Sequence, residues 1–161
     1  MIIEDKKGNQ LLALQRSDED ALAAAEPLTH AFVVVRNGDG KHLLVFDRYK
    51  SHWELAGGSM EPTETARECA RRELEEESGI LCSAESLRFV GVMTFLLAPS
   101  RNHPSSRIEY GALYAIDVVE VPPFEPNAEI EATTWWDRLA PIGDVGVIDA
   151  KLIELAWQTT T

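Results

Sequence analysis

Residues 57–80 read GGSMEPTETARECARRELEEESGI, a glycine pair followed by a charged segment rich in helix-forming residues. Thr65 and Glu68 have the S/T-x-x-E spacing of a capping box, so a helix is predicted to begin directly after Thr65. Gly79 stands where helices commonly end in the left-handed conformation that glycine adopts without strain. We therefore predict a helix over residues 66–78, preceded by a tight glycine turn.

Three glutamates of this predicted helix lie on one side of it. Glu73, Glu76 and Glu77 are three and four positions apart, and residues at those spacings share a helix face. Clustered carboxylates repel one another, which raises their pKa values unless cations lie between them. Mg²⁺ prefers oxygen ligands and is usually bound by a few carboxylates together with substrate phosphates. The segment therefore predicts a Mg²⁺ site, with Mn²⁺ as the alternative, and disfavours a structural zinc site.

The rest of the chain alternates strand-like apolar runs with turns and ends in a second helical pattern. Residues 37–40, Asn-Gly-Asp-Gly, are a strong hairpin signal between two apolar runs. Residues 17–26 are acidic and alanine-rich, which is compatible with a short helix or a loop. The expected strands cover residues 10–16, 31–36, 42–48, 53–55, 87–98, 110–120 and 131–136, and the second helix covers residues 147–157.

This order of elements predicts an α/β fold in which a mixed β-sheet is flanked by helices on two faces. A chain of 161 residues is long enough for a substantial core, and we expect residues 1–161 to form a single domain. Residues 1–28 carry no motif and are either an N-terminal extension or the first strand. Residues 159–161 are expected to fray.

The charge balance limits the class of partner. With 15 Lys and Arg against 27 Asp and Glu, the net charge is −12, which argues against a nucleic-acid polymer as partner, because such a partner requires a basic surface. A small anionic substrate remains compatible, because divalent cations reverse the local field of an acidic cluster. No apolar run approaches the roughly 20 residues of a membrane helix. Cys69 and Cys82 are too few for a disulfide framework, so we expect a cytoplasmic protein without a membrane partner.

The spacing within the quoted segment resembles the signature of the Nudix hydrolases, G-x5-E-x7-R-E-U-x-E-E-x-G-U, where U is a bulky aliphatic residue. Every fixed position is filled, by Gly58, Glu64, Arg72, Glu73, Leu74, Glu76, Glu77, Gly79 and Ile80. The resemblance covers roughly residues 29–157 and implies an α/β/α sandwich. At two positions outside the signature, the residue differs from the one that is common in the family. Ala56 replaces a proline before the glycine pair, and Thr63 replaces a glycine before the first glutamate.

The resemblance also implies a chemistry, the hydrolysis of a nucleoside diphosphate linked to another group. In the family, water attacks a phosphorus of the pyrophosphate bridge with the help of bound metal ions. Residue by residue, the metal-binding role falls on Glu73, Glu76 and Glu77, and a backbone carbonyl at Gly58 is a further ligand. Glu64 and Arg72 are expected to support these carboxylates electrostatically.

The general base differs among family members. Glu73 or Glu77 is the expected base here, and a glutamate outside the signature is the third choice. Family members often carry an acidic residue shortly before a W-x-D/E-x-L-like stretch, and Glu129 matches that position best, with Glu131 next. Glu129 is therefore expected either to complete the metal site or to act as the base.

The identity of the substrate stays open at this point. A compact domain favours a nucleoside triphosphate such as a dNTP, and ADP-ribose or a nucleotide sugar is the alternative. Two other functions remain open, a module that senses a nucleotide without cleaving it and a lipid-diphosphate isomerase-like enzyme, although neither cysteine suits the latter. A homodimer is also left open. We expect the substrate to be contacted by Arg48, Trp53, Arg101 and Arg107.

Overall fold

The computed structural model describes residues 2–158, so the expected fraying of residues 159–161 lies outside the described part of the chain. The strands are β1 (Ile3–Glu4), β2 (Gln10–Arg16), β3 (Leu28–Arg36), β4 (His42–Asp47), β5 (His52–Glu54), β6 (Ala56–Ser59), β7 (Arg88–Leu97), β8 (Arg107–Asp117) and β9 (Ile130–Trp136). The helices are α1 (Ala66–Ser78) and α2 (Val147–Ala156), with two short 3₁₀ helices, η1 (Glu19–Ala24) and η2 (Ala84–Ser86).

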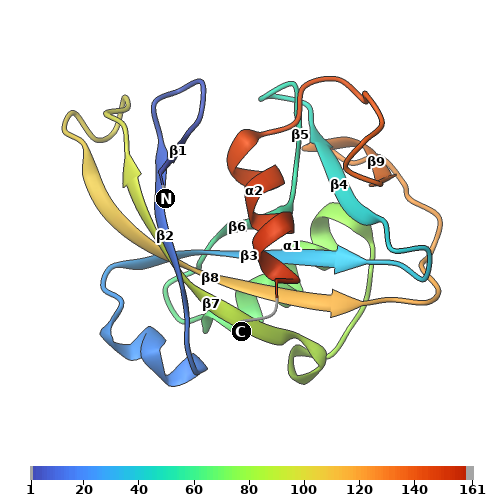
Figure 1. The fold of residues 1–161 in the computed structure, drawn as a ribbon, viewed down its shortest axis with the longest axis horizontal. Coiled ribbons are helices and arrows are strands. Elements are labelled where there is room, and N and C mark those ends of the chain that lie inside the picture. Colours follow the sequence, from blue (N-terminus) through green and yellow to red (C-terminus); the bar gives the residue numbers. More distant parts are fainter. Residues whose placement is uncertain (1, 159–161) are drawn as a thin grey trace.

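Within residues 2–158, the strands form one sheet in the order β1-β2-β7-β8-β3-β4-β5, with β6 paired to β3 and β9 paired to β4. β3 runs parallel to β8, and the other pairings are antiparallel. In Figure 1, α2 lies in front of the sheet and α1 lies behind it. The predicted mixed sheet with helices on two faces is therefore confirmed.

The central strand β3 separates two hydrophobic cores, because successive side chains of a strand point to opposite faces. Val33 packs with α1 on one side, and Val34 packs with α2 on the other. On the α1 side, Cys69 and Ala70 are fully buried, and these small side chains let the helix lie close to the sheet. On the α2 side, Leu152 closes the second core.

The predicted elements are confirmed with small shifts at their ends, and β8 shows the largest difference. It spans residues 107–117 instead of 110–120, because its ladder with β7 continues outward until Arg107 faces Leu97. Arg107 therefore belongs to a strand, although the strand was expected to begin only at residue 110. The strand predicted over residues 10–16 is present and pairs with β7.

The N-terminal residues also contribute ordered structure. The stretch predicted as a short helix or a loop contains η1, which is tied to α1 by an ion pair between Glu19 and Arg67 at 2.5 Å. β1 pairs with β2 at one edge of the sheet. Among residues 2–158, neither α1 nor α2 is long and apolar enough to cross a membrane.

Candidate active site

Helix α1 begins and ends at the residues that the sequence predicted. The Thr65 hydroxyl accepts a hydrogen bond from the Glu68 N–H at 3.1 Å, and the Glu68 carboxylate accepts one from the Thr65 N–H at 3.4 Å. Gly79 ends the helix in the left-handed region, with φ of 78°. These local bonds fix where the glutamates of the helix lie relative to the sheet.

The tight turn predicted at the glycine pair is wrong, because Gly57 and Gly58 lie in strand β6. β6 pairs with β3, and this pairing holds the glycine backbone against α1. A Cβ atom at Gly58 would lie 2.5 Å from the Oε1 atom of Glu73. Any larger residue at this position would therefore displace the Glu73 carboxylate, which explains physically why glycine precedes this helix.

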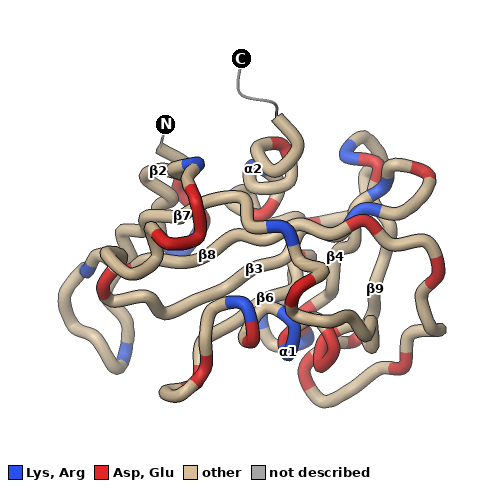
Figure 2. Tube along the Cα trace, turned by 90° about the horizontal axis from the view of Figure 1, so that it is seen from below, with Lys and Arg blue, Asp and Glu red and all other residues tan. Residues whose placement is uncertain are grey.

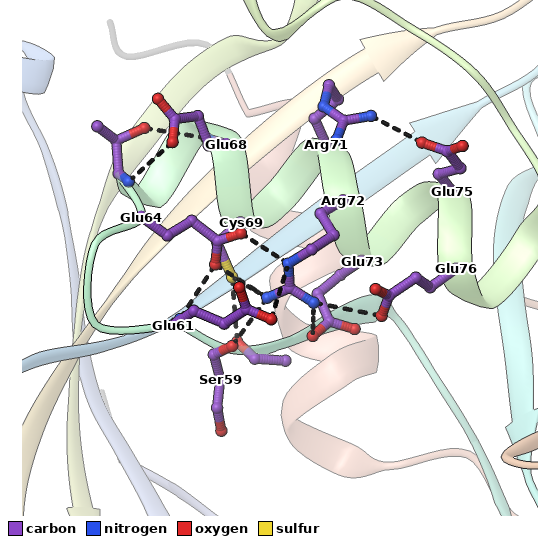
Figure 3. Close-up of polar contacts among 12 residues, drawn as sticks. Ser59, Glu61, Glu64, Glu68, Cys69, Arg71, Arg72, Glu73, Glu75 and Glu76 are labelled. Atoms are coloured by element: carbon purple, nitrogen blue, oxygen red, sulfur yellow. Dashed lines mark hydrogen bonds and ion pairs between the residues drawn. The ribbon is translucent and has the colours of Figure 1, made fainter.

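Arg72 is the centre of a carboxylate network in Figure 3. Its guanidinium donates two hydrogen bonds to Glu64, with Nε–Oε2 at 2.6 Å and Nη2–Oε1 at 2.9 Å. It also donates to Glu73 at 3.1 Å, to Glu76 at 3.2 Å and to the Ser59 carbonyl at 3.2 Å. The hydrogen bonds from Arg72 lower the pKa of Glu64 to about 2, so Glu64 stays ionised. The supporting role predicted for Arg72 and Glu64 agrees with this geometry.

Glu77 is the most deeply buried of the glutamates in this segment. Its side chain points towards the sheet, where one carboxylate oxygen accepts a hydrogen bond from the Gly57 N–H at 2.7 Å. Burial, with a smaller contribution from nearby carboxylates, raises the pKa of Glu77 to about 9. Burial also raises the pKa of Glu73, against the opposing effect of Arg72. Glu76, in contrast, has an exposed side chain.

The acidic cluster extends beyond α1 to Glu129, which the sequence had indicated, and to Glu54 and Asp47, which sequence reasoning missed. The charges of Glu54, in β5, and Glu129, just before β9, both raise the pKa of Glu77. Asp47, at the end of β4, together with Glu54 raises the pKa of Glu129 in addition to burial. Figure 2 shows acidic positions gathering around α1. The only signal for Glu54 in the sequence was a carboxylate placed just before the glycine pair.

The chemistry of this cluster fits a hard divalent cation. Its side-chain donors are carboxylate oxygens, and hard cations prefer oxygen ligands. A carboxylate buried among others is costly unless it is protonated or paired with a cation. Among residues 2–158, no three His, Cys, Asp or Glu side chains converge closely enough to form a ready-made metal site. The carboxylates are therefore grouped, with Glu73 and Glu76 turned towards Arg72, and are not yet closed around a common point.

Glu129 is held at the edge of the cluster by its own loop. The side chain of Asn127 accepts hydrogen bonds from the N–H groups of Glu129 at 3.0 Å and Ile130 at 2.8 Å, and its amide donates to the Glu76 carbonyl at 3.2 Å. Arg48 donates its backbone N–H to the Glu129 carbonyl and its guanidinium to the Asn127 carbonyl. The structure thus shows Arg48 supporting the loop that carries Glu129.

A cavity of about 300 Å³ lies between α2 and the sheet. Its apolar walls include Phe32, Phe95 and Leu152, and Glu54 lines it on the side of the acidic cluster. His30 also lines this cavity and stacks parallel to Phe32, with ring centroids 6.1 Å apart. The cavity and the acidic cluster therefore share a boundary at β5.

A second, more open cavity lies beside the residues that follow Gly58. It is lined by residues that include His30, Ser59 and Glu64, His103 from the β7–β8 connection, and Arg107 from the start of β8. Arg107 forms an ion pair with Glu109 at 3.2 Å.

The structure brings Arg107 to the site but leaves two other predicted contacts outside both cavities. Arg101 is exposed in the β7–β8 connection. Trp53 packs edge-on against Phe46 and donates its indole N–H to the Ile142 carbonyl at 3.0 Å.

The family model of the NUDIX domain matches residues 26–155, which is most of the chain. The chain belongs to the Nudix hydrolase family. The match includes β3, the whole α1 segment and most of α2. The fold and the catalytic class that the sequence resemblance implied are therefore confirmed. No curated protein sequence matches the chain.

Solved structures with the same fold carry different names and bound molecules. The Bacillus subtilis pyrophosphohydrolase BsRppH is 24% identical, with a TM-score of 0.62, and the match covers 88% of this chain and 80% of that one. The E. coli dihydroneopterin triphosphate pyrophosphohydrolase is 23% identical, with a TM-score of 0.58 and coverages of 81% and 94%. The NUDIX domain of Shewanella oneidensis NrtR, solved with ADP ribose, is 17% identical, with a TM-score of 0.62 and coverages of 87% and 96%. At these identities the similarity concerns the fold.

Proposed function

We propose that this Nudix hydrolase cleaves the pyrophosphate linkage of a nucleoside diphosphate derivative in a reaction that depends on Mg²⁺, with Mn²⁺ as the alternative. The observation that carries the proposal is the burial of Glu77 beside Glu73, Glu54 and Glu129. A protein gains no stability from like charges brought together, so such a cluster is typical of a site that binds cations or moves protons.

The ligands proposed for the cation are those that the family resemblance named. The carboxylates of Glu73, Glu76, Glu77 and Glu129 and the carbonyl of Gly58 would hold it. When bound, the ion supplies positive charge that stabilises the leaving phosphate and lowers the pKa of a water molecule. Arg72 orients Glu73 and Glu76, and Glu64 in turn fixes Arg72 through two hydrogen bonds. Such supporting contacts keep carboxylates in a productive orientation.

The attacking water needs a proton acceptor within reach of the cluster. Glu73 and Glu77 are the first candidates for this general base, and Glu129 is the third. In the absence of a cation, burial raises the pKa of all three carboxyls, as is common for groups at functional sites. Binding of a cation would lower these pKa values again.

A nucleoside triphosphate such as a dNTP is the favoured substrate within this proposal, with ADP-ribose or a nucleotide sugar as the alternative. The cavity of about 300 Å³ between α2 and the sheet fits one nucleoside-sized group on that side of the cluster. The complete set of signature carboxylates counts against a module that senses a nucleotide without cleaving it. Arg107 and His103, on the second cavity, are suited to hold phosphate oxygens.

The composition of the whole chain supports a proposal for the compartment and the partners of the protein. We propose that residues 1–161 act as one domain on a small nucleotide, in the cytoplasm, without a nucleic-acid polymer or a membrane as partner. The net charge of −12 supports the exclusion of a polymer. Cys69 and Cys82 are both free thiols, which supports a reducing compartment. A homodimer remains an open alternative.

The test is hydrolysis of a panel of nucleoside triphosphates, ADP-ribose and nucleotide sugars with Mg²⁺, measured as phosphate or nucleotide release. Glu77→Gln is expected to reduce kcat by on the order of 10³-fold or more while the fold survives. Glu75→Gln is the matched control, because Glu75 lies on the same helix but pairs with Arg71 on the exposed side. Near-normal turnover in Glu77→Gln, or no hydrolysis of any substrate by the unmodified protein, would contradict the proposal.

A further inference from the structure

The cavity between α2 and the sheet has the shape and lining of a site for a flat ring. Phe32 and Phe95 pack at a tilt, with ring centroids 6.4 Å apart, and Leu97 and Leu152 add apolar surface around them. The His30 ring stacks on the Phe32 ring, within 5° of parallel, and both residues line the cavity, so that flat ring systems already pack at its wall. A group with two apolar faces and a polar edge matches such a lining.

The polar groups of the cavity lie at its rim, not on this surface. In β5, Glu54 accepts hydrogen bonds from Lys50 at 3.2 Å and His52 at 3.0 Å. The charge of Glu54 also raises the pKa of Glu77, which places the rim next to the acidic cluster. A substrate whose phosphates lie at the cluster would therefore extend past Glu54 and place its remaining group in the cavity.

Asp149 is the carboxyl group that α2 contributes to this cavity. Its Oδ1 atom accepts a hydrogen bond from the Leu55 N–H at 2.9 Å. That bond orients the side chain and leaves the second oxygen, which lies over Gly146, to a ligand. Gly146 lines the same cavity, and a side chain at that position would collide with this oxygen. The backbone is therefore shaped around the Asp149 carboxyl.

We propose that this cavity binds the nucleobase of the substrate, and that Asp149 reads the edge of the base and favours an amino substituent over an oxo substituent. The inference rests on the proposed function, since it names the group that is attached to the phosphates. A sugar fits the lining less well, because its hydroxyl groups point in many directions and would lose hydrogen bonds to water against the phenylalanine surface.

The preference for an amino group follows from the charge state of Asp149. Burial raises its pKa to about 7, so at pH 8 most molecules carry an ionised Asp149, which only accepts hydrogen bonds. An amino group donates to it, whereas an oxo group offers a second acceptor and is disfavoured. The other titratable groups around the same cavity are Asp5, Lys6, Lys7, His30, Lys50, His52, Glu54 and Asp144.

The experiment compares two pairs of substrates that exchange an amino for an oxo group on the base, ATP against ITP and CTP against UTP. At pH 8 with Mg²⁺, Asp149→Asn keeps an oxygen for the Leu55 N–H but replaces the other oxygen with an amide donor. The amino-to-oxo ratio of kcat/KM is expected to fall by about tenfold or more in this variant, in at least the pair whose base is accepted. A purely structural role would lower kcat/KM equally for both members of a pair and leave the ratio unchanged, which would overturn the inference.

Asp137→Asn is the matched control. Asp137 likewise accepts hydrogen bonds from backbone N–H groups, those of Leu139 and Ala140, but it does not line the cavity. The amino-to-oxo ratio is expected to stay unchanged in this variant. A fall equal to that in Asp149→Asn would mean that the ratio reports a general effect of charge, and would also overturn the inference.

A binding measurement separates this inference from the proposed function. The α,β-methylene analogues of the same four nucleotides are titrated by calorimetry against the unmodified protein and against Asp149→Asn. A change in the amino-to-oxo ratio of Kd without any hydrolysis of the natural nucleotides would support the cavity assignment and contradict the enzyme. Hydrolysis of the natural nucleotides with no change in the amino-to-oxo ratio of kcat/KM or of Kd would support the enzyme and contradict the cavity assignment.

Discussion

At the scale of single residues, Arg72 decides how the carboxylates of the candidate site are oriented. Its guanidinium reaches Glu64, Glu73 and Glu76 together, which a lysine ammonium lacks the planar fork to do. Arg72→Lys is therefore expected to reduce kcat by about 10- to 100-fold, the range seen when contacts that orient metal ligands are removed. Steady-state kinetics at saturating Mg²⁺ measures this loss, and the apparent affinity for Mg²⁺ should weaken in parallel.

Arg71→Lys provides the control for this prediction. Arg71 is the neighbouring arginine of the same helix, but it pairs only with Glu75, four residues on, on the exposed side. Its replacement is expected to leave kcat within about twofold of the unmodified protein, because exposed pairs of this kind contribute little. Equal effects of the two substitutions would show that the helix tolerates either change and that Arg72 does not orient the carboxylates.

At the scale of elements, the start of α1 is stabilised by its capping box. Thr65→Ala removes the hydroxyl that accepts the Glu68 N–H, so the free energy of unfolding is expected to fall by about 1 kcal/mol. In a chain of this size that corresponds to a Tm lower by roughly 2–4 °C in a calorimetric scan. Thr63→Ala is the control, since Thr63 is exposed and precedes the helix. A drop of the same size in both variants would show that the cap is not the cause.

Features that depend on contacts between nearby residues could be predicted from the sequence, whereas features that depend on contacts between distant residues could not. The bounds of α1 were predictable, because the bonds that set them join residues three or four positions apart. The role of Glu54 was not, since it depends on β5 lying beside α1. Asp149 was equally hidden, because its partner Leu55 is 94 positions away. The strand was expected to begin only after Arg107, because the strand partner of Arg107, Leu97, lies across the β7–β8 connection.

In the candidate site, too, the features set by local spacing were predictable and those set by the sheet were not. The spacing within one helix was enough to group Glu73, Glu76 and Glu77, and the structure keeps all three near the glycine pair. The spacing did not show that Glu77 is buried while Glu76 is exposed, because that difference comes from the sheet under the helix. Arg101 and Trp53 were chosen for their chemical type alone, and the structure places both outside the cavities.

At the scale of the whole molecule, buried carboxyls set how stability depends on pH. The pKa of Asp149 is raised by burial to about 7, above its usual value of 3.8. A group with a raised pKa in the folded state binds its proton more tightly there than in the unfolded state. Its stabilising contribution is therefore complete below about pH 4 and is lost as the pH rises through 7. Groups with lowered pKa values, such as Glu64, act in the opposite sense and lose their contribution only in acid.

Asp149→Asn isolates this contribution, because asparagine stays neutral at every pH and keeps an acceptor for the Leu55 N–H. The two proteins are expected to unfold with the most similar free energies near pH 4 and below, where Asp149 is protonated in both the folded and the unfolded state. Between about pH 4 and pH 7 the variant should become the more stable of the two, by on the order of a few kcal/mol, and the difference should then stay constant up to about pH 9. Urea unfolding across this pH range, with a chelator present to remove divalent cations, measures the difference. A difference that does not change with pH would show that Asp149 is ionised in the folded protein throughout this range. Burial would then not raise the pKa of Asp149.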